Sequence, residues 1–362
     1  MSTAVRVLFV SHTDTASGAE RVLLSLAALA IAAGHNVVVA CPTGDLSAAL
    51  PAGARHFPLP KLGLSGPTGW RRYVAMVGLL VRYVRAAASL RPFTRDPRTR
   101  IVVNSLFALP ALRLTLRRRC CTWLVHDTLT MRKQQVILRF SAPAIRRAVA
   151  VSRSTAAPLA DFDFPVVVAY NGVPTRPVPV RVDHPGRPVV GVLAKLTPWK
   201  GHLVALEALK LVPDADLEFA GDHFPGEDDY VDELRRVANE PELSGRVRFL
   251  GHCDPDDCLD RWTALISPSV APEAGPLGIL EAMAAGRPVI ATDHGGSAEY
   301  LAGGAGILVP PADPDALADA VRTAIGDDQL RRSLADAGRR RVTELHDIAV
   351  TLPHTLNQLL NA

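Results

Sequence analysis

The sequence contains few aromatic residues and few cysteines. Phe, Trp and Tyr make up 5% of the 362 residues, so the hydrophobic core has to be built mainly from Ala, Val and Leu. The five cysteines show no C-x2-C spacing of the kind found in zinc sites. With an odd count and no secretory signal, we expect reduced thiols. We interpret Cys253 and Cys258 as small buried apolar side chains rather than as a metal pair.

Long apolar segments are also missing. Residues 1–12 contain no basic region followed by a long apolar stretch, so a secretory signal is not expected. The longest apolar runs, 22–33 and 73–81, are shorter than the ~18 residues that a membrane-spanning helix requires. We therefore expect a cytoplasmic protein that does not cross a membrane.

Acidic residues are scarce in one part of the chain. Residues 61–160 hold 19 Lys and Arg but only two acids, Asp96 and Asp127, although the formal charge of the whole chain is only +4. The remainder of the chain is therefore acidic overall. This asymmetry indicates either an anionic partner for the N-terminal half or a solvated arginine-rich surface, and composition leaves both open.

The glycine-rich fingerprint G-x-G-x-x-G is absent, which disfavours a dinucleotide cofactor. No residues have the spacing of a metal site. Two Asp-x-Asp pairs occur, Asp161/Asp163 and Asp254/Asp256, but each lies in a predicted loop where turn formation explains it. The sequence therefore predicts neither a bound cofactor nor a metal.

Short apolar segments recur along the whole chain, as is typical of strands buried on both faces of a parallel sheet. Helical patterns separate them, and five prolines within 174–188 indicate a linker. We predict an α/β protein with two Rossmann-like doubly wound domains, 1–180 and 181–340, facing across a cleft, and a C-terminal helix, 341–362, that returns to the N-terminal domain. The predicted strands are 5–10, 36–41, 101–103, 122–125, 148–151, 166–169, 189–194, 217–220, 247–250, 264–267, 288–291 and 306–309.

The strongest candidate site surrounds two glutamates, Glu273 and Glu281, which are eight residues apart. Pro276 between them favours the start of a helix. The free N–H groups of Leu277 and Gly278, together with the helix dipole, would favour binding of a diphosphate. Glu273 would accept hydrogen bonds from sugar hydroxyls and Glu281 from a ribose. Two solvated glutamates on an amphipathic helix are the alternative.

Two lysines follow the first predicted strand of the second half. Lys195 lies in the loop after this strand and Lys200 at the start of the next helix. Ligands of such sheets bind at the carboxyl ends of the strands, so two cations there would neutralise a leaving diphosphate. Taken alone, loop lysines are more often simply solvated.

The first half contributes two further candidates. Gly18 follows the first strand and permits close approach of a phosphate to a helix N-terminus. His126 follows the strand 122–125, where it can orient a sugar hydroxyl or contact charge that develops at an anomeric carbon. A structural histidine is the alternative interpretation of His126.

In their order and spacing these motifs resemble those of the GT-B-fold retaining glycosyltransferases of glycosyltransferase family 4. The resemblance implies an acceptor-binding N-terminal domain and a nucleotide-sugar-binding C-terminal domain, as in bacterial carbohydrate or natural-product biosynthesis. It also implies a UDP- or GDP-linked sugar as co-substrate. The segments that carry it are SGAERVLLSLA, VHD, AVSRSTA, AYNGV, KLTPWKGH, VRFLGH, PEAGPLGILEAMAAGRPVIATDHGGSAEYL and ILVPPADPDALADAV.

The resemblance also implies roles for single residues, including Gly251 and His252, which help to hold the base. Lys195 stands where the family usually has Arg, so a forked contact to phosphate is replaced by a point charge. Gly275 and Pro276 stand where an aromatic residue and a glycine are usual. The candidate donor-binding residues are Gly18, Lys195, Lys200, Gly251, His252, Glu273, Leu277, Gly278 and Glu281, and the candidate catalytic residues are His126, Lys195, Lys200 and Glu273.

The expected reaction is a front-face substitution, in which the acceptor hydroxyl attacks from the face that the phosphate leaves and passes its proton to a phosphate oxygen. It needs neither a covalent nucleophile nor a metal. A nucleotide-sugar epimerase or a phosphorylase on the same fold is one alternative. A non-catalytic partner subunit is another.

The basic stretch 70–119 bears on the acceptor. Arginines alternate with apolar residues there, as in a basic amphipathic helix that lies on an anionic membrane. A core helix with exposed arginines is the alternative. The expected acceptor is a lipid-linked glycan at the inner membrane face or a small soluble molecule, such as a cyclitol. No nucleic-acid partner is expected.

Overall fold

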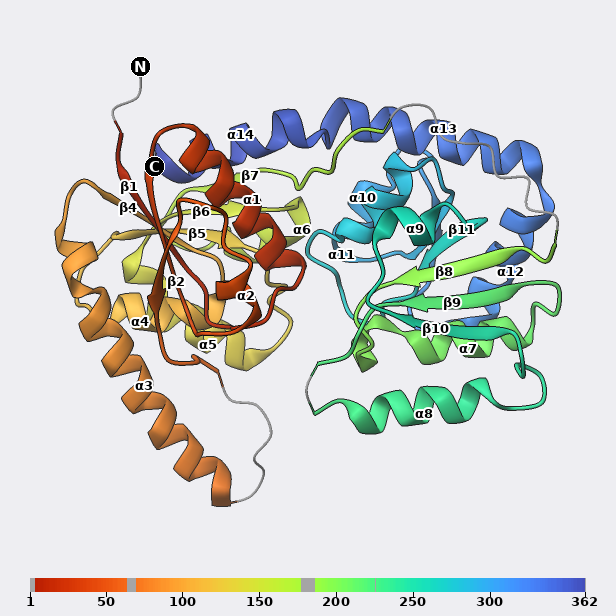
Figure 1. The fold of residues 1–362 in the computed structure, drawn as a ribbon, viewed down its shortest axis with the longest axis horizontal. Helices are drawn as coiled ribbons and strands as arrows, with labels where there is room; N and C mark the ends of the chain where they lie inside the picture. The colour runs from red at the N-terminus through yellow and green to blue at the C-terminus, as the bar shows by residue number, and fades with distance from the viewer. Residues whose placement is uncertain (1–3, 64–69, 177–185, 225, 362) are drawn as a thin grey trace. The chain divides into compact units, whose positions relative to one another are not determined.

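A computed structural model describes residues 4–63, 70–176, 186–224 and 226–361 (Figure 1). The chain forms two compact units. Unit 1 comprises Met1–Asn171 with Val350–Ala362, and unit 2 comprises Gly172–Ala349. Most of the predicted linker, and the predicted boundary at 180, lie outside the described residues.

Within the described residues, unit 1 has a seven-stranded parallel sheet in the order β3-β2-β1-β4-β5-β6-β7. All six strands predicted for the first half are present. The strand β3 was not predicted, because its four residues RHFP are partly or fully exposed and form no apolar run. The strands are β1 (Arg6–Val10), β2 (Asn36–Cys41), β3 (Arg55–Pro58), β4 (Thr99–Val103), β5 (Cys121–Val125), β6 (Ile145–Ala150) and β7 (Val166–Val168).

Helices cover both faces of this sheet, which explains why β1 is buried from Val7 to Val10. From β1 to β2 the chain moves towards one edge of the sheet, and from β3 to β4 it moves towards the other edge. Because both crossovers are right-handed, α1 and α3 lie on opposite faces of the sheet. α3, α4 and α5 pack side by side. The helices are α1 (Gly18–Ala32), α2 (Asp45–Ala48), α3 (Trp70–Arg95), α4 (Leu109–Arg113), α5 (Arg132–Ser141) and α6 (Arg153–Ala156).

The C-terminal segment contains two helices, α13 (Asp328–Leu345) and α14 (Ile348–Leu360), rather than one helix that begins at 341. The break follows His346, where Val173 and Asp347 form a parallel bridge. The end of α14 is held by strands of unit 1. Arg100 Nε donates to the Leu360 carbonyl at 3.2 Å, and Arg147 Nη1 donates to the Gln358 carbonyl at 3.3 Å.

The helix α3 matches only in part the alternative of a core helix with exposed arginines. Its C-terminal half supplies Ala86 and Leu90 to the core of unit 1, but its N-terminal half extends beyond the sheet with apolar side chains exposed (Figure 1). Among the described helices, α3 alone is long and apolar enough by length and composition to cross a membrane; the segment is Tyr73–Arg95, and an 18-residue window within it has a mean hydropathy of 1.4. This length was not predicted, because Arg82 interrupts the apolar run 73–81.

The described part of unit 2 has a six-stranded parallel sheet in the order β10-β9-β8-β11-β12-β13, which completes the predicted fold class of two Rossmann-like units. All six strands predicted for the second half are present. The strands are β8 (Val189–Leu193), β9 (Asp216–Ala220), β10 (Val247–Gly251), β11 (Ala264–Ser267), β12 (Val289–Thr292) and β13 (Ile307–Val309); the helices are α7 (His202–Lys210), α8 (Asp228–Ala238), α9 (Pro255–Leu259), α10 (Leu277–Ala284), α11 (Gly295–Tyr300), α12 (Pro314–Gly326) and α13.

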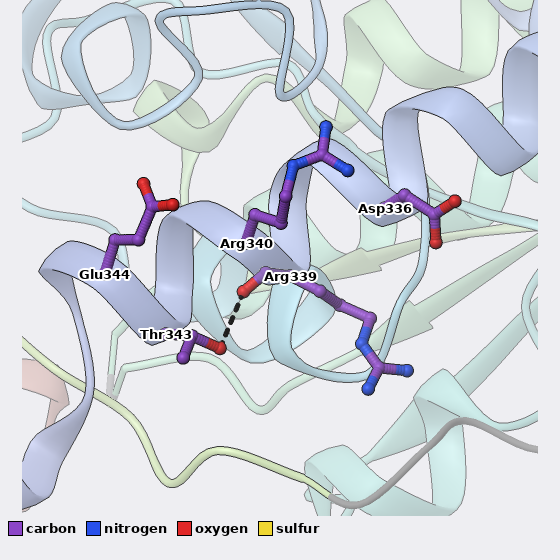
Figure 2. Close-up of a pocket in the computed structure, with 5 residues that line it drawn as sticks. All are labelled: Asp336, Arg339, Arg340, Thr343 and Glu344. Carbon is purple, nitrogen blue, oxygen red and sulfur yellow. Dashed lines mark hydrogen bonds between the residues drawn. The ribbon is translucent and has the colours of Figure 1, made fainter.

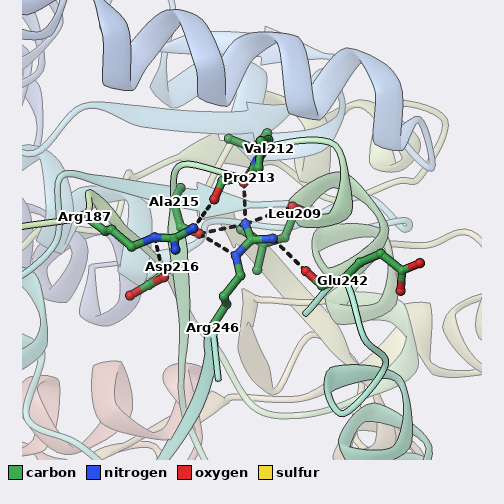
Figure 3. A network of polar contacts seen from close by, with 8 residues as sticks. All are labelled: Arg187, Leu209, Val212, Pro213, Ala215, Asp216, Glu242 and Arg246. Carbon is green, nitrogen blue, oxygen red and sulfur yellow. Dashed lines mark hydrogen bonds and ion pairs between the residues drawn. The ribbon is translucent and has the colours of Figure 1, made fainter. Parts of the chain in front are cut away.

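An arginine network stabilises the amino-terminal edge of this sheet (Figure 3). The guanidinium of Arg246, just before β10, donates to backbone carbonyls at the end of α7, in the turn that follows it and before β10. Its acceptors are the carbonyls of Leu209 (3.1 Å), Val212, Ala215 (2.8 Å) and Glu242 (2.8 Å). The Leu209 and Val212 carbonyls also accept backbone N–H groups of the turn, so Arg246 adds a charged donor to carbonyls that already hold the turn together.

Cys253 and Cys258 form a disulfide, which contradicts the expectation of reduced, unpaired thiols at these positions. The start of α9 at Pro255 turns the chain, so that the two Cα atoms lie 6.7 Å apart. Sequence spacing does not show this turn. The free cysteines of the described residues are Cys41, Cys120 and Cys121.

Candidate functional site

The carboxyl edge of the unit 2 sheet collects most of the candidate residues. Lys195 follows β8 and Gly251 ends β10. Glu273 lies in the loop between β11 and α10. Because β10, β9, β8, β11 and β12 are parallel neighbours, their carboxyl ends meet at one edge, where ligands of doubly wound sheets bind.

Lys200 and Glu273 form the central contact of this site. Lys200 Nζ donates to both carboxylate oxygens of Glu273, at 2.6 and 2.7 Å, although 73 residues separate the two. Glu273 is 6% exposed, and Ser269 Oγ also donates to its carboxylate. Lys200 Nζ lies 4.3 Å from the centre of the Trp199 ring. A buried carboxylate is thereby held in one orientation by an ammonium group and a hydroxyl.

The backbone around Lys200 is pressed against the end of β11. The Val270 N–H donates to the Trp199 carbonyl at 2.9 Å. Gly201 has φ +74°, and a Cβ on it would lie 1.9 Å from the Pro268 carbonyl oxygen. Only glycine therefore permits this approach, which places Lys200 beside the Glu273 loop.

The loop of Glu273 packs against the segment 294–296, whose two glycines and histidine were assigned no role from the sequence. The Gly296 N–H donates to the Glu273 carbonyl at 2.7 Å, and a Cβ on Gly295 would lie 2.4 Å from that same oxygen. His294 Nε2 hydrogen-bonds the Ser269 carbonyl at 2.8 Å. The sequence signal was the motif HGGS, residues 294–297, shortly after the predicted strand 288–291.

The helix α10 begins at Leu277, with Pro276 at the N-cap rather than in the first turn. The N-cap residue, Pro276, makes no side-chain cap hydrogen bond to the first N–H groups. Gly278 packs closely on β8, since a Cβ there would lie 2.9 Å from the Leu193 carbonyl oxygen. Glu281 is 8% exposed and lies one turn into the helix. The helix terminus thus offers backbone donors beside Glu273.

Lys195 is placed differently from Lys200. Its Nζ lies 4.9 Å from the centre of the Phe224 ring, and within the described residues it forms no ion pair with a carboxylate. The structure therefore joins Lys200, and not Lys195, to Glu273.

The loop after β10 holds the two candidate base-binding residues. Gly251 is the last residue of β10, and its carbonyl accepts from the Gly221 N–H at 2.8 Å. His252 follows and is exposed. The Cys253–Cys258 disulfide begins one residue later.

Two candidates belong to unit 1. Gly18 is the first residue of α1, preceded by Ser17 at the N-cap. Ser17 and Ser11 each donate a hydroxyl hydrogen bond to Glu20, which is 3% exposed. The Ser17 hydroxyl is therefore directed to the Glu20 carboxylate and does not cap a backbone N–H.

His126 follows β5 directly. Burial lowers its pKa to about 4, so the imidazole is neutral at neutral pH. Its Nε2 is buried and has no hydrogen-bond partner among the described residues. Asp127, to which no role was assigned, accepts from the Leu106 N–H at 2.9 Å. Burial, aided by nearby Glu20 and opposed by that hydrogen bond, raises the pKa of Asp127 to about 6.

Two other features of the described residues lie apart from these candidates. No group of three or more His, Cys, Asp or Glu in the described part of the chain has the arrangement of a metal site. A pocket along α13 is lined by residues of that helix alone (Figure 2). These residues are Asp336, Arg339, Arg340, Thr343 and Glu344, and none is a candidate.

Two family models match the chain. The model described as Glycosyltransferase Family 4 matches residues 16–176, and the model described as Glycosyl transferases group 1 matches residues 180–341. Together the two matches cover nearly the whole chain.

Curated relatives match parts of the chain. A lipopolysaccharide core biosynthesis glycosyltransferase of Rhizobium meliloti is 32% identical over 44% of this chain and 46% of the relative. A phosphatidyl-myo-inositol mannosyltransferase of Mycolicibacterium smegmatis is 37% identical over 40% of this chain and 38% of the relative. Each match therefore spans less than half of the relative's length.

Solved structures superpose over nearly the entire chain. Anabaena HepE in complex with UDP-glucose has a TM-score of 0.80 at 21% identity, over 99% of this chain and 100% of that chain. Sucrose-phosphate synthase from Thermosynechococcus elongatus has a TM-score of 0.79 at 21% identity, over 99% of this chain and 98% of that chain. These similarities show that the fold is GT-B.

Proposed function

The chain belongs to the GT-B glycosyltransferases of the family 4 type, and from this premise we propose that it transfers a sugar from a nucleotide diphosphate to an acceptor hydroxyl with retention of anomeric configuration. The observation that carries the proposal is the buried Lys200–Glu273 contact beside the uncapped start of α10. The Glu273 carboxylate can accept hydrogen bonds from sugar hydroxyls, and the Lys200 ammonium and the first N–H groups of α10 can donate to a diphosphate.

Glu273 binds the donor sugar in this proposal. Its carboxylate has about four acceptor positions, and the hydrogen bonds from Lys200 and Ser269 leave capacity for a sugar hydroxyl. Glu281, one turn further along, receives the ribose. Gly251 and His252 at the end of β10 hold the base.

Lys200 serves both the sugar pocket and the diphosphate. An ammonium group has three N–H donors, of which two reach Glu273, and the third is available to a phosphate oxygen. Lys195 adds a second cation, and the N–H groups of Leu277 and Gly278 add the positive end of a helix dipole. Within unit 1, Gly18 gives an exposed helix start that is itself suited to a phosphate. Chain residues supply this positive charge, so the proposed reaction is metal-independent.

The reaction proceeds at the front face of the sugar. The acceptor oxygen forms its bond to the anomeric carbon while the bond from that carbon to the diphosphate breaks. The acceptor proton passes to a phosphate oxygen. Neutral His126 orients a hydroxyl near the anomeric carbon rather than acting as a cation. A proton shuttle from the protein and a covalent sugar–enzyme intermediate are both unnecessary.

The names of the relatives guide the choice of acceptor. They include phosphatidylinositol and lipopolysaccharide-core transferases as well as a D-inositol 3-phosphate glycosyltransferase. We accordingly propose a hydroxyl of a lipid-linked glycan or of a small soluble molecule as acceptor. The proposed location is cytoplasmic, at the inner membrane face where the acceptor is lipid-linked. The proposed donor carries UDP or GDP, and HepE and its bound UDP-glucose exemplify the first.

The test is hydrolysis or transfer from a panel of UDP- and GDP-sugars by the wild type, Lys200→Ala, Lys195→Ala and Glu273→Gln. The two variants at Lys200 and Glu273 should lose at least about 100-fold in kcat/KM, as expected for removal of charge stabilisation in the transition state. Lys210→Ala at the other end of α7, where the lysine pairs with Glu207 and Glu240, is the matched control and should retain full activity.

Wild-type rates in all three site variants would contradict the assignment. Donor binding without turnover over a broad acceptor panel would indicate a non-catalytic subunit instead. NMR of the product reports the anomeric configuration, and inversion would refute the proposed mechanism while leaving the transferase class intact.

A further inference from the structure

The N-terminal half of α3 exposes a continuous apolar surface. Tyr73, Val77, Leu80 and Val84 follow one another at helical spacing, so they form one stripe along the helix. Their exposed fractions lie between 54% and 74%. Neighbouring exposed side chains widen the stripe. These are Val74, Met76 and Val81.

The opposite side of α3 is packed on unit 1. Tyr83 donates a hydrogen bond from its hydroxyl to the Phe107 carbonyl at 2.9 Å, and Ala86 and Leu90 are fully buried in the core. The position and direction of the helix are therefore fixed by unit 1. The exposed apolar side chains belong to the projecting half of an ordered helix and not to a loose end (Figure 1).

Basic residues lie at the end where the apolar stripe stops. Arg91 and Arg95 continue the line of Val77 and Val84 around the helix, and both are exposed. The exposed Arg117 donates to the Thr94 carbonyl at 3.4 Å, which brings the basic loop 117–119 to the same end. The sequence of α3 contains no Asp or Glu. The one acid that follows it directly, Asp96, is paired with Arg6. One helix thus presents an apolar half followed by a cationic end, with no acid of its own.

From this arrangement we propose that α3 docks unit 1 on an anionic lipid surface. The apolar side chains between Tyr73 and Val84 enter the interfacial layer, and Arg91, Arg95 and Arg117 contact headgroup phosphates. Apolar burial and cationic attraction together are the two contributions that hold a helix at an anionic bilayer. This proposal does not depend on the reaction proposed above.

The same helix is too short to span a bilayer while unit 1 remains folded. The part that projects before Tyr83, residues 73–82, is about 15 Å long at 1.5 Å per residue, whereas the hydrocarbon layer is about 30 Å thick. The remaining length, from Ala86 onward, is committed to the core. Surface docking therefore follows, and not transmembrane insertion.

Lipid fits this surface better than a second copy of the chain does. A symmetric α3–α3 contact would bring two cationic ends, or an apolar half and a cationic end, against each other with no acid on either helix. Anionic headgroups supply the missing negative charge.

The experiment is co-sedimentation of the full chain with two kinds of vesicle, phosphatidylcholine alone and phosphatidylcholine with about 30% phosphatidylglycerol. Binding to the anionic vesicles should exceed binding to the neutral ones at least tenfold, and it should weaken in about 0.5 M NaCl, where charge is screened. Equal binding to both kinds of vesicle, or no binding to either, would overturn the proposal.

Variants separate the two contributions. Val77→Asp with Leu80→Asp should lower binding to anionic vesicles at least tenfold. Arg91→Glu with Arg95→Glu should abolish the preference for anionic lipid. Val350→Asp on α14 is the matched control, because Val350 is 68% exposed and Val77 is 66% exposed. It should bind like the wild type. Circular dichroism checks that each variant folds, and retained binding by a folded Val77/Leu80 variant would refute the role of α3.

Two further readouts address the other possible occupants of the surface. Light scattering without lipid should give a monomer mass for the wild type. A dimer that the Val77/Leu80 variant dissociates would assign the surface to a second copy. Bound protein should be released by alkaline carbonate, whereas resistance to this wash would indicate a spanning helix and overturn surface docking.

Discussion

Asp127 is a partly buried carboxyl group whose protonation changes close to neutral pH. Its folded-state pKa of about 6 lies above the ordinary value of 3.8. Between these values the unfolded chain releases the proton while the folded chain keeps it, so this group's contribution to stability falls as pH rises through that window. The penalty is complete above about pH 6 and amounts to roughly 3 kcal/mol at about 1.4 kcal/mol per pKa unit.

Asp127→Asn should therefore stabilise the protein at pH 7.5 while keeping an acceptor for the Leu106 N–H. The gain over the wild type should shrink by about 1.4 kcal/mol for each pH unit from 6 down to 4. Urea unfolding at several pH values measures it. Burial also lowers the pKa values of His12, His126 and His202 to about 4. These histidines titrate in both proteins, so their contributions cancel in the difference between the two free energies of unfolding. A gain that does not vary with pH would contradict the raised pKa.

The Lys200–Glu273 pair predicts strong coupling between two single changes. Replacing one partner leaves the other charge buried, which typically costs about 3–5 kcal/mol. Lys200→Met should destabilise unit 2 by about 3 kcal/mol, and Glu273→Gln by a similar amount.

The double variant should recover much of that loss, because no unpaired charge then remains. Urea midpoints of the four proteins in the cycle give the coupling free energy. Simple additivity of the two losses would show that the contact does not persist in solution.

At the scale of elements, Arg246 joins the end of α7 to the starts of β9 and β10. Arg246→Met keeps most of the apolar stem but removes the charged donors from several backbone carbonyls. We expect a loss of about 3 kcal/mol in the free energy of unfolding, since hydrogen bonds to charged groups contribute about 1.5–3 kcal/mol each and water replaces some of them.

The control for this prediction is Arg235→Met on α8. Arg235 is 62% exposed, and its contact with Asp232 is 4.0 Å long. Such a change should stay within about 0.5 kcal/mol of the wild type. Equal effects of the two substitutions on the urea midpoint would show that the network of Arg246 adds nothing.

Elements defined by local pattern were predicted well. The strand runs VLFV and VVVAC are apolar enough to show burial on both faces, whereas RHFP carries no such signal and β3 was missed. For α3 the sequence shows a helix but not which side the protein covers, because that depends on the packing of Tyr83, Ala86 and Leu90. The disulfide was missed because a turn at Pro255, rather than a spacing rule, brings Cys253 near Cys258.

The candidate site was predicted in its residue types and not in its contacts. Glu273 and Lys200 were both chosen, yet no pattern states that a lysine contacts a glutamate 73 residues later. The roles of Gly295, Gly296 and His294 also appear only when β11 and β12 lie side by side. Pairing of strands, which is tertiary information, therefore supplies the geometry.

At the scale of the whole molecule, each unit has its own hydrophobic core. We therefore expect a nucleotide sugar to stabilise one unit selectively. A donor at about 100 times its dissociation constant adds roughly 2.7 kcal/mol to whichever unit binds it. Calorimetry with a panel of UDP- and GDP-sugars should move the transition of unit 2, and Lys200→Ala should remove the shift. Movement of the unit 1 transition alone would place the nucleotide in the other unit.

The position of α14 has a consequence for biosynthesis. Residues 350–362 belong to unit 1, and their carbonyls satisfy Arg100 and Arg147, yet the ribosome makes them after every residue of unit 2. Domains generally fold in the order of their translation. Here unit 1 emerges first but stays incomplete until residues 350–362 have been made. Unit 2 emerges second and is therefore the first to complete its fold.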